Sequence, residues 1–122
     1  MRRLGETLQS LETVIAARKD APADRSYTSR LLAGGVPAIG AKVTEEAGEL
    51  AAAAAAESDA RVVSEAADLV YHTLVLLACR GLGLSQVEDE LARRFGISGL
   101  EEKASRGAAA PSEPPRPQGT AS

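Results

Sequence analysis

Residues 45–79 read EEAGELAAAAAAESDARVVSEAADLVYHTLVLLAC, and this stretch decides the fold class. Alanine and leucine, which favour helices, dominate the stretch, and a Ser-Asp pair at 58–59 divides it into two halves of helical length. The second half is apolar nearly all the way round over 66–79, which is typical of a helix buried on most faces. The stretch therefore predicts a helical hairpin, with helices over about 37–57 and 60–80.

The whole chain of 122 residues has the same compositional bias. It contains 24 alanines and 14 leucines, against 8 valines, 3 isoleucines and three aromatic residues. Because residues favoured in strands are scarce, the composition predicts an all-α fold, which we expect to be an antiparallel helical bundle. Alanine buries little apolar area, so a single copy would have a thin core. We therefore expect a homodimer to complete the bundle.

Helical periodicity, caps and glycines predict the remaining elements. An apolar stripe with steps of four, three and four residues predicts a first helix over about 4–18. A short helical segment with a serine N-cap is expected over 26–32, and the glycines at 34–35 interrupt the chain after it. A capping box with serine and glutamate opens a helix over about 85–95, and one or two further turns are expected over 100–106.

From residue 107 the chain consists largely of alanine, proline and polar residues, and this segment contains four of the six prolines. Such a composition predicts one helical domain over 1–106 and a disordered tail over 107–122. The single cysteine permits no internal disulfide, and no window of the chain reaches the roughly 18 apolar residues of a membrane span. We expect a cytoplasmic protein that contacts no membrane. The formal net charge of −3 argues against a nucleic-acid partner.

Acidic residues are concentrated in the predicted hairpin. Residues 45–68 carry seven acidic residues and one basic residue, a local charge of −6. Carboxylates three or four residues apart on a helix project to the same side. Two sets have this spacing: Glu45, Glu46 and Glu49 on the first helix, and Glu65 and Asp68 on the second.

The geometry of a hairpin brings these two sets together. If the turn lies near Ser58, the four residues other than Glu45 lie at heights of about 10 to 18 Å above the turn, and the heights from the two helices alternate. Converging carboxylates repel one another, and a hard divalent cation, Mg²⁺ or alternatively Mn²⁺, would resolve the repulsion. The alternative interpretation is an acidic helix face exposed to solvent. His72 on the apolar helix fits a hydrogen-bonded core residue better than a metal ligand.

Four segments of the chain resemble the MazG-like, all-α nucleoside triphosphate pyrophosphohydrolases and, among these, the phosphoribosyl-ATP pyrophosphohydrolase family of histidine biosynthesis. They are SYT with RLL at 26–32, KVxEEAxE at 42–49, EAADLVYH at 65–72 and SGxEEKASR at 98–106. The resemblance covers about residues 4–106. It implies a cytoplasmic enzyme that hydrolyses phosphoribosyl-ATP to phosphoribosyl-AMP and pyrophosphate, the second step of the pathway, with Mg²⁺ as cofactor.

The resemblance also implies roles for individual residues. The metal ligands would come from Glu45, Glu46, Glu49, Glu65 and Asp68, and the first three of these are the candidate catalytic carboxylates. The residues that would contact the substrate phosphates are Lys42, Arg30, Lys103 and Arg106. Two alternatives remain open. One is a housekeeping nucleoside triphosphate pyrophosphohydrolase of the same fold, and the other is a non-catalytic helical dimer that binds metal.

Overall fold

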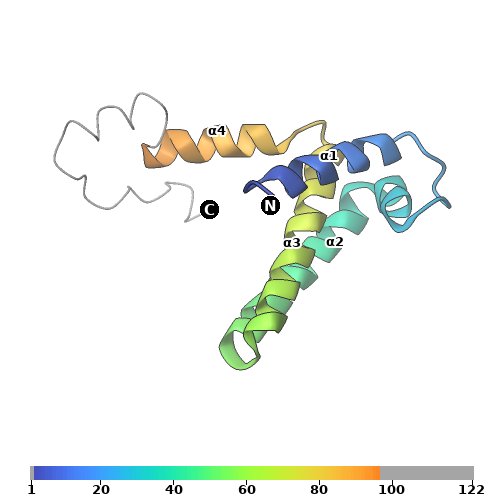
Figure 1. Ribbon diagram of the computed structural model, residues 1–122. Helices are drawn as coiled ribbons and strands as arrows, with labels where there is room; N and C mark the ends of the chain where they lie inside the picture. Colours follow the sequence, from blue (N-terminus) through green and yellow to red (C-terminus); the bar gives the residue numbers. More distant parts are fainter. Residues whose placement is uncertain (1, 97–122) are drawn as a thin grey trace. The chain divides into compact units, whose positions relative to one another are not determined.

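The computed structural model describes residues 2–96, and all the regular elements within this range are helical. The all-α prediction is therefore confirmed. The predicted turns over 100–106, the domain boundary at 106 and the tail lie outside the described residues and stay predictions. The elements, shown in Figure 1, are α1 (Glu6–Arg18), α2 (Tyr27–Ala56), α3 (Asp59–Cys79) and α4 (Leu84–Phe95).

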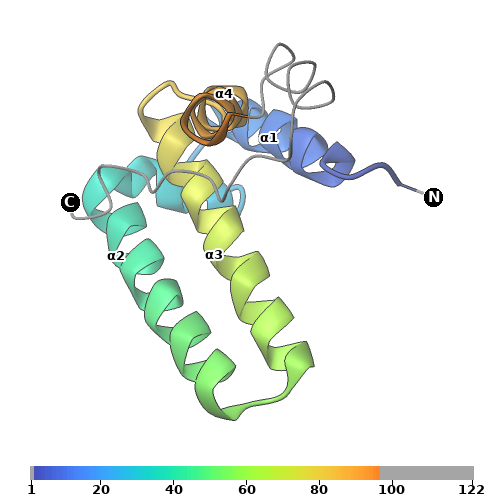
Figure 2. The same ribbon diagram turned by 90° about the vertical axis from the view of Figure 1, so that its left-hand side faces the viewer.

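The predicted hairpin is formed by α2 and α3, which run side by side in opposite directions (Figure 2). A short turn connects them, and Ser58 caps the start of α3, because its side-chain oxygen accepts a hydrogen bond from the Arg61 backbone N–H at 3.3 Å. Ala53 of α2 is completely buried. Its small side chain allows the two helices to approach closely at this position.

A kink at Gly35 divides α2 into the two segments that the sequence predicts. Gly35 has φ 73° and ψ −168°, a combination that is essentially restricted to glycine. Ser26 caps the first segment through a 3.0 Å hydrogen bond from the Ser29 backbone N–H. Pro37 follows the kink at a position equivalent to a first helical turn, where its missing N–H group costs little. Local signals thus place the start and the bend of α2 correctly.

The core of residues 2–83 is small. Its largest fully buried side chains are Ile15 of α1, Ile39 of α2 and Val75 of α3. α1 crosses the end of the hairpin that carries the C-terminus of α3, and Lys19 donates a 2.8 Å hydrogen bond to the Ala78 carbonyl there. The same carbonyl accepts a 3.0 Å hydrogen bond from the Gly81 backbone N–H, so the lysine adds a second donor at the end of α3.

α3 differs from expectation in two respects. By length and composition alone it could cross a membrane, so the expectation that no window of the chain is apolar enough for a span is wrong. Core helices of soluble proteins can have the same length and apolar composition. Only 22% of the 18-residue apolar segment within α3 is buried, so a single copy of the chain does not bury most faces of this helix. Val63 and Val70, which lie seven residues apart, are 67% and 40% exposed. One copy therefore leaves an apolar face of α3 uncovered.

α4 belongs to a separate unit that begins at Leu84, and we describe it by itself. It starts one residue before the predicted capping serine and ends before Gly96, whose φ of 68° terminates the helix. On its surface Glu90 pairs with Arg93 and with Arg94, the latter at 2.9 Å. These hydrogen bonds lower the pKa of Glu90 to about 2. The predicted helix over 85–95 is confirmed to within one residue.

Candidate metal centre and substrate site

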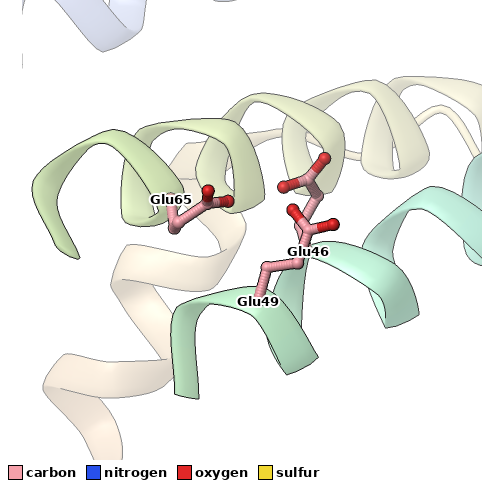
Figure 3. Close-up of side chains that lie close together, drawn as sticks. All are labelled: Glu46, Glu49 and Glu65. Carbon is pink, nitrogen blue, oxygen red and sulfur yellow. The ribbon is translucent and has the colours of Figure 1, made fainter. Parts of the chain in front are cut away.

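Three carboxylates meet between α2 and α3 (Figure 3). One oxygen atom from each of Glu46, Glu49 and Glu65 lies within 4.8 Å of the other two. Glu46 and Glu65 are only 6% and 4% exposed, whereas Glu49 is exposed. The predicted convergence of acidic residues across the hairpin is therefore observed for these three residues, which we call the carboxylate cluster.

Two oxygen atoms of the carboxylate cluster are buried without a hydrogen-bond partner among the described residues. They are Oε1 of Glu46 and Oε1 of Glu65. Leaving a buried acceptor without a partner is costly, and more so when it carries charge. A divalent cation would satisfy both atoms. Because the donor set consists of carboxylate oxygens, it suits a hard cation such as Mg²⁺ or Mn²⁺.

The electrostatics of the carboxylate cluster favour protonation as long as no cation is bound. Burial raises the pKa of Glu46, and the charge of nearby Asp68 raises it further. The pKa of Glu49 is raised first by a hydrogen bond that its protonated form can share with Glu65, and then by burial and by the charge of Glu46. A bound cation would act in the opposite direction, because it stabilises the ionised carboxylates.

We expect Mg²⁺ to raise the thermal unfolding midpoint at neutral pH, and this rise to shrink as the pH falls. In the metal-free chain, Glu46 and Glu49 hold protons more tightly when folded than when unfolded. Their ionisation therefore lowers stability as the pH rises from the usual glutamate value of 4.5 through the raised pKa values. At high pH bound Mg²⁺ removes this penalty, and at low pH protons displace Mg²⁺ from the carboxylates. Thermal melts with and without Mg²⁺ between about pH 5 and about pH 8 measure the effect. A Mg²⁺ effect that is independent of pH would contradict this prediction.

The other two predicted ligands lie beside the carboxylate cluster. Asp68 is exposed, yet its charge is close enough to raise the pKa of Glu46. Glu45 is exposed and forms an ion pair with Lys42 at 3.2 Å. Neither residue belongs to the group of oxygens within 4.8 Å. Their roles as metal ligands stay predictions.

The predicted phosphate-binding residues differ in their placement. Lys42 is half-buried one turn before Glu46 on α2, and its hydrogen bond to Glu45 and the nearby Tyr27 raise its pKa. Its ammonium group is therefore positively charged at neutral pH. Arg30 is exposed on the first segment of α2. Lys103 and Arg106 lie outside the described residues.

A polar and aromatic network joins the start of α2 to α3. The buried His72 donates from Nδ1 to the Asp68 carbonyl at 2.9 Å, because a carbonyl oxygen can only accept. The other ring nitrogen, Nε2, forms a hydrogen bond with the Tyr27 hydroxyl at 3.0 Å. The Tyr71 hydroxyl bonds that of Thr28, and the two tyrosine rings stack with centroids 6.3 Å apart. The interpretation of His72 as a hydrogen-bonded core residue is confirmed.

Arg61 is a charged neighbour of the carboxylate cluster that the sequence analysis did not single out. Its guanidinium bonds Oε2 of Glu65 and also Oε1 of Glu57, the latter at 3.1 Å. A signal for this contact was present in the sequence. Arg61 is the only basic residue in the acidic stretch over 45–68, and it lies four residues from each of its partners, a spacing that suits ion pairs on a helix.

Fold and site together define an all-α protein whose central hairpin carries a carboxylate cluster suited to a divalent cation. The family model for phosphoribosyl-ATP pyrophosphohydrolase matches residues 8–95. The phosphoribosyl-ATP pyrophosphatase of Erythrobacter litoralis is 55% identical over 101 residues, which are 83% of this chain and 97% of that protein. Those of Parvibaculum lavamentivorans and Azorhizobium caulinodans are 54% and 51% identical, over 82% of this chain and 92% of each protein. The chain belongs to the phosphoribosyl-ATP pyrophosphohydrolase family.

Proposed function

We propose that this protein hydrolyses phosphoribosyl-ATP to phosphoribosyl-AMP and pyrophosphate, as a step of histidine biosynthesis in the cytoplasm. Family membership supports the activity, since the matching relatives are phosphoribosyl-ATP pyrophosphatases. The observation that carries the proposal is that one oxygen each of Glu46 and Glu65, within the carboxylate cluster, is buried and has no hydrogen-bond partner in the described part of the chain. Helix packing alone does not require two such costly atoms side by side.

We assign the metal site to Glu46, Glu49 and Glu65, with Glu45 and Asp68 as further ligands or as partners of metal-bound groups. A Mg²⁺ or Mn²⁺ ion held there would neutralise negative charge on the phosphates. Burial of Glu46 and Glu65 fixes their carboxylates and excludes water from the inner side of the site. The exposed Glu49 borders both the cluster and solvent, so we assign it the main part in positioning the attacking water, together with Glu45 and Glu46.

We assign phosphate binding to Lys42, Arg30, Lys103 and Arg106. Of the two that lie among the described residues, Lys42 is one turn before Glu46 on α2, and its ammonium group is held there by Glu45. A phosphate oxygen can compete with the Glu45 carboxylate for this exposed ion pair, because such pairs contribute little stability. A lysine in this position draws the phosphates towards the cluster and offsets part of its negative charge.

The substrate assignment is tested by pyrophosphate release from phosphoribosyl-ATP and from a panel of ordinary nucleoside triphosphates under identical conditions with Mg²⁺. We expect kcat/KM for phosphoribosyl-ATP to exceed that for ATP by at least about 100-fold, since a site that pairs with polar substrate groups rejects analogues that lack them. Equal or faster turnover of common triphosphates would instead assign the protein to the housekeeping pyrophosphohydrolases of this fold.

We also propose that a second copy of the chain covers the open face of the hairpin. Val63 and Val70 lie seven residues apart on α3 and so face a similar direction, and both are exposed in one copy. All but one of the six alanines over 51–56 on α2 are exposed as well. Small side chains on one helix beside bulky apolar ones on the next form a surface on which two hairpins can pack closely.

Sedimentation equilibrium is expected to give twice the chain mass of 12.6 kDa. Val63→Glu should shift the equilibrium towards the monomer, because it places a charge on the apolar surface that the second copy covers. Gln9→Glu, which adds the same charge at an exposed position on α1, is the matched control and should leave the dimer intact. A monomeric wild-type protein would contradict the proposal.

A further inference from the structure

Arg61 bridges two carboxylates along one side of the hairpin's turn. Its Nε donates to Oε1 of Glu57 at 3.1 Å, and its Nη2 donates to Oε2 of Glu65. Glu57 is the C-cap of α2, and Arg61 lies in the first turn of α3, where its backbone N–H also bonds Ser58. The backbone of Arg61 is thus held by a helix cap, and its planar guanidinium is held through two of its nitrogen atoms, Nε and Nη2.

The two oxygens of Glu65 have different surroundings. Arg61 satisfies Oε2, whereas Oε1 is buried and has no hydrogen-bond partner among the described residues. The terminal torsion of a glutamate is broad and poorly restricted by itself. A donor fixed to one oxygen therefore sets the orientation of the whole carboxylate. With Arg61 on Oε2, the free atom Oε1 remains for the group that occupies the carboxylate cluster.

We propose that Arg61 is a positioning residue for Glu65. It holds Oε2, so that Glu65 contributes Oε1 alone to a divalent cation in the carboxylate cluster. This inference rests on the metal site assigned under the proposed function. Removal of a residue that hydrogen-bonds a metal ligand commonly weakens metal binding by about 10- to 100-fold. Arg61 therefore acts on the metal through Glu65 and requires no contact with the substrate.

The positive charge of Arg61 has an opposing effect, because it repels a cation. The side chain of Arg61 is 55% exposed, whereas that of Glu65 is only 5% exposed. Water screens the exposed charge of Arg61, so its repulsion of a cation at the cluster is weak. The hydrogen bond to the buried carboxylate is direct and is screened much less. When Arg61 is replaced, losing the orientation of the Glu65 carboxylate should therefore weaken cation binding more than losing the repulsion by Arg61 strengthens it.

The test is a titration of the full-length protein with Mn²⁺, in which free Mn²⁺ is measured by electron paramagnetic resonance. Arg61→Met keeps an unbranched apolar stem but loses the guanidinium with its donors and charge, and it should weaken Mn²⁺ binding by about 10-fold or more. Arg61→Gln should also bind more weakly than wild type, and Arg61→Lys, which retains a charged donor, should recover part of the loss. Glu57→Gln is the matched control, because it removes the other ion pair of Arg61 and leaves the contact with Glu65. Its affinity should stay within about 2-fold of wild type, as expected for an exposed pair.

The outcomes separate this inference from the metal site on which it rests. If wild type binds Mn²⁺ and Arg61→Met or Arg61→Gln binds it equally or more tightly, the positioning role is wrong and the metal site stands. If wild type binds no Mn²⁺, the metal site and the inference both fail. Where Arg61→Met does not fold, as judged by circular dichroism, Arg61→Gln decides. Hydrolysis provides a second readout: a high Mg²⁺ concentration should restore most of kcat in Arg61→Gln, which would not happen if Arg61 contacted the substrate or only stabilised the fold.

Discussion

Replacement of Glu46 by glutamine is expected to lower Mg²⁺-dependent hydrolysis by roughly 10²- to 10³-fold, the usual cost of removing a charge-stabilising group from a catalytic site. The same change should raise the thermal midpoint of the metal-free protein. Glu46 is buried, its Oε1 has no partner among the described residues, and burial and the charge of Asp68 raise its pKa. Glutamine has nearly the same shape and carries no charge, so it relieves repulsion but is a poor ligand for a hard cation.

Steady-state kinetics and thermal melts of the same preparations measure these opposite changes. Glu88→Gln provides the matched control, because Glu88 is exposed on α4 and the substitution is chemically identical. It should change neither activity nor thermal midpoint. If the acidic residues served a non-catalytic helical dimer, Glu46→Gln would leave Mg²⁺ affinity and any hydrolysis unchanged. Unchanged hydrolysis in Glu46→Gln therefore contradicts the catalytic assignment.

Gly35→Ala is expected to lower the free energy of unfolding by about 1 to 3 kcal/mol, the usual cost of a backbone conformation that only glycine adopts readily. Gly35 has φ 73° and ψ −168° at the kink of α2. The kink directs the first segment of α2 so that Tyr27 meets His72 and Thr28 meets Tyr71 on α3. Alanine would oppose the kink, so these contacts should weaken along with global stability. Chemical denaturation measures the loss.

Gly40→Ala is the matched control for the kink. Gly40 lies in the second segment of α2, its φ is not positive, and a Cβ atom added there would have nothing within 4 Å. Because alanine favours the helix interior over glycine, this variant should be more stable than wild type by about 0.5 to 1 kcal/mol. If Gly35→Ala were as stable as Gly40→Ala, the strained conformation at the kink would not determine how α2 folds.

The helices could be predicted closely because local chemistry determines their ends. Ser26 caps the helix that it was expected to cap, the Ser58-Asp59 pair separates α2 from α3 as expected, and the break expected at the paired glycines is the kink at Gly35. α1 begins two residues later than expected, at Glu6, because Gly5 precedes it with φ 90°. Such boundaries depend on a few neighbouring residues, so sequence reasoning reaches them to within one or two positions.

The carboxylate cluster could be predicted only in part. Helix rise from the turn correctly predicts that Glu46, Glu49 and Glu65 converge, because axial height depends only on counting residues. Burial cannot be counted in this way, since it depends on how each helix is rotated about its axis and on what packs against it. For the same reason the exposure of Asp68 became evident only in three dimensions.

The central claim is that this protein cleaves phosphoribosyl-ATP between its α and β phosphates with the help of a divalent cation at the carboxylate cluster. The most direct test follows the reaction of purified protein with phosphoribosyl-ATP and Mg²⁺ by ³¹P NMR. We expect pyrophosphate and phosphoribosyl-AMP to form in equal amounts, and no reaction when a chelator removes the metal. Release of orthophosphate with phosphoribosyl-ADP, or equal turnover with and without the chelator, would contradict the claim.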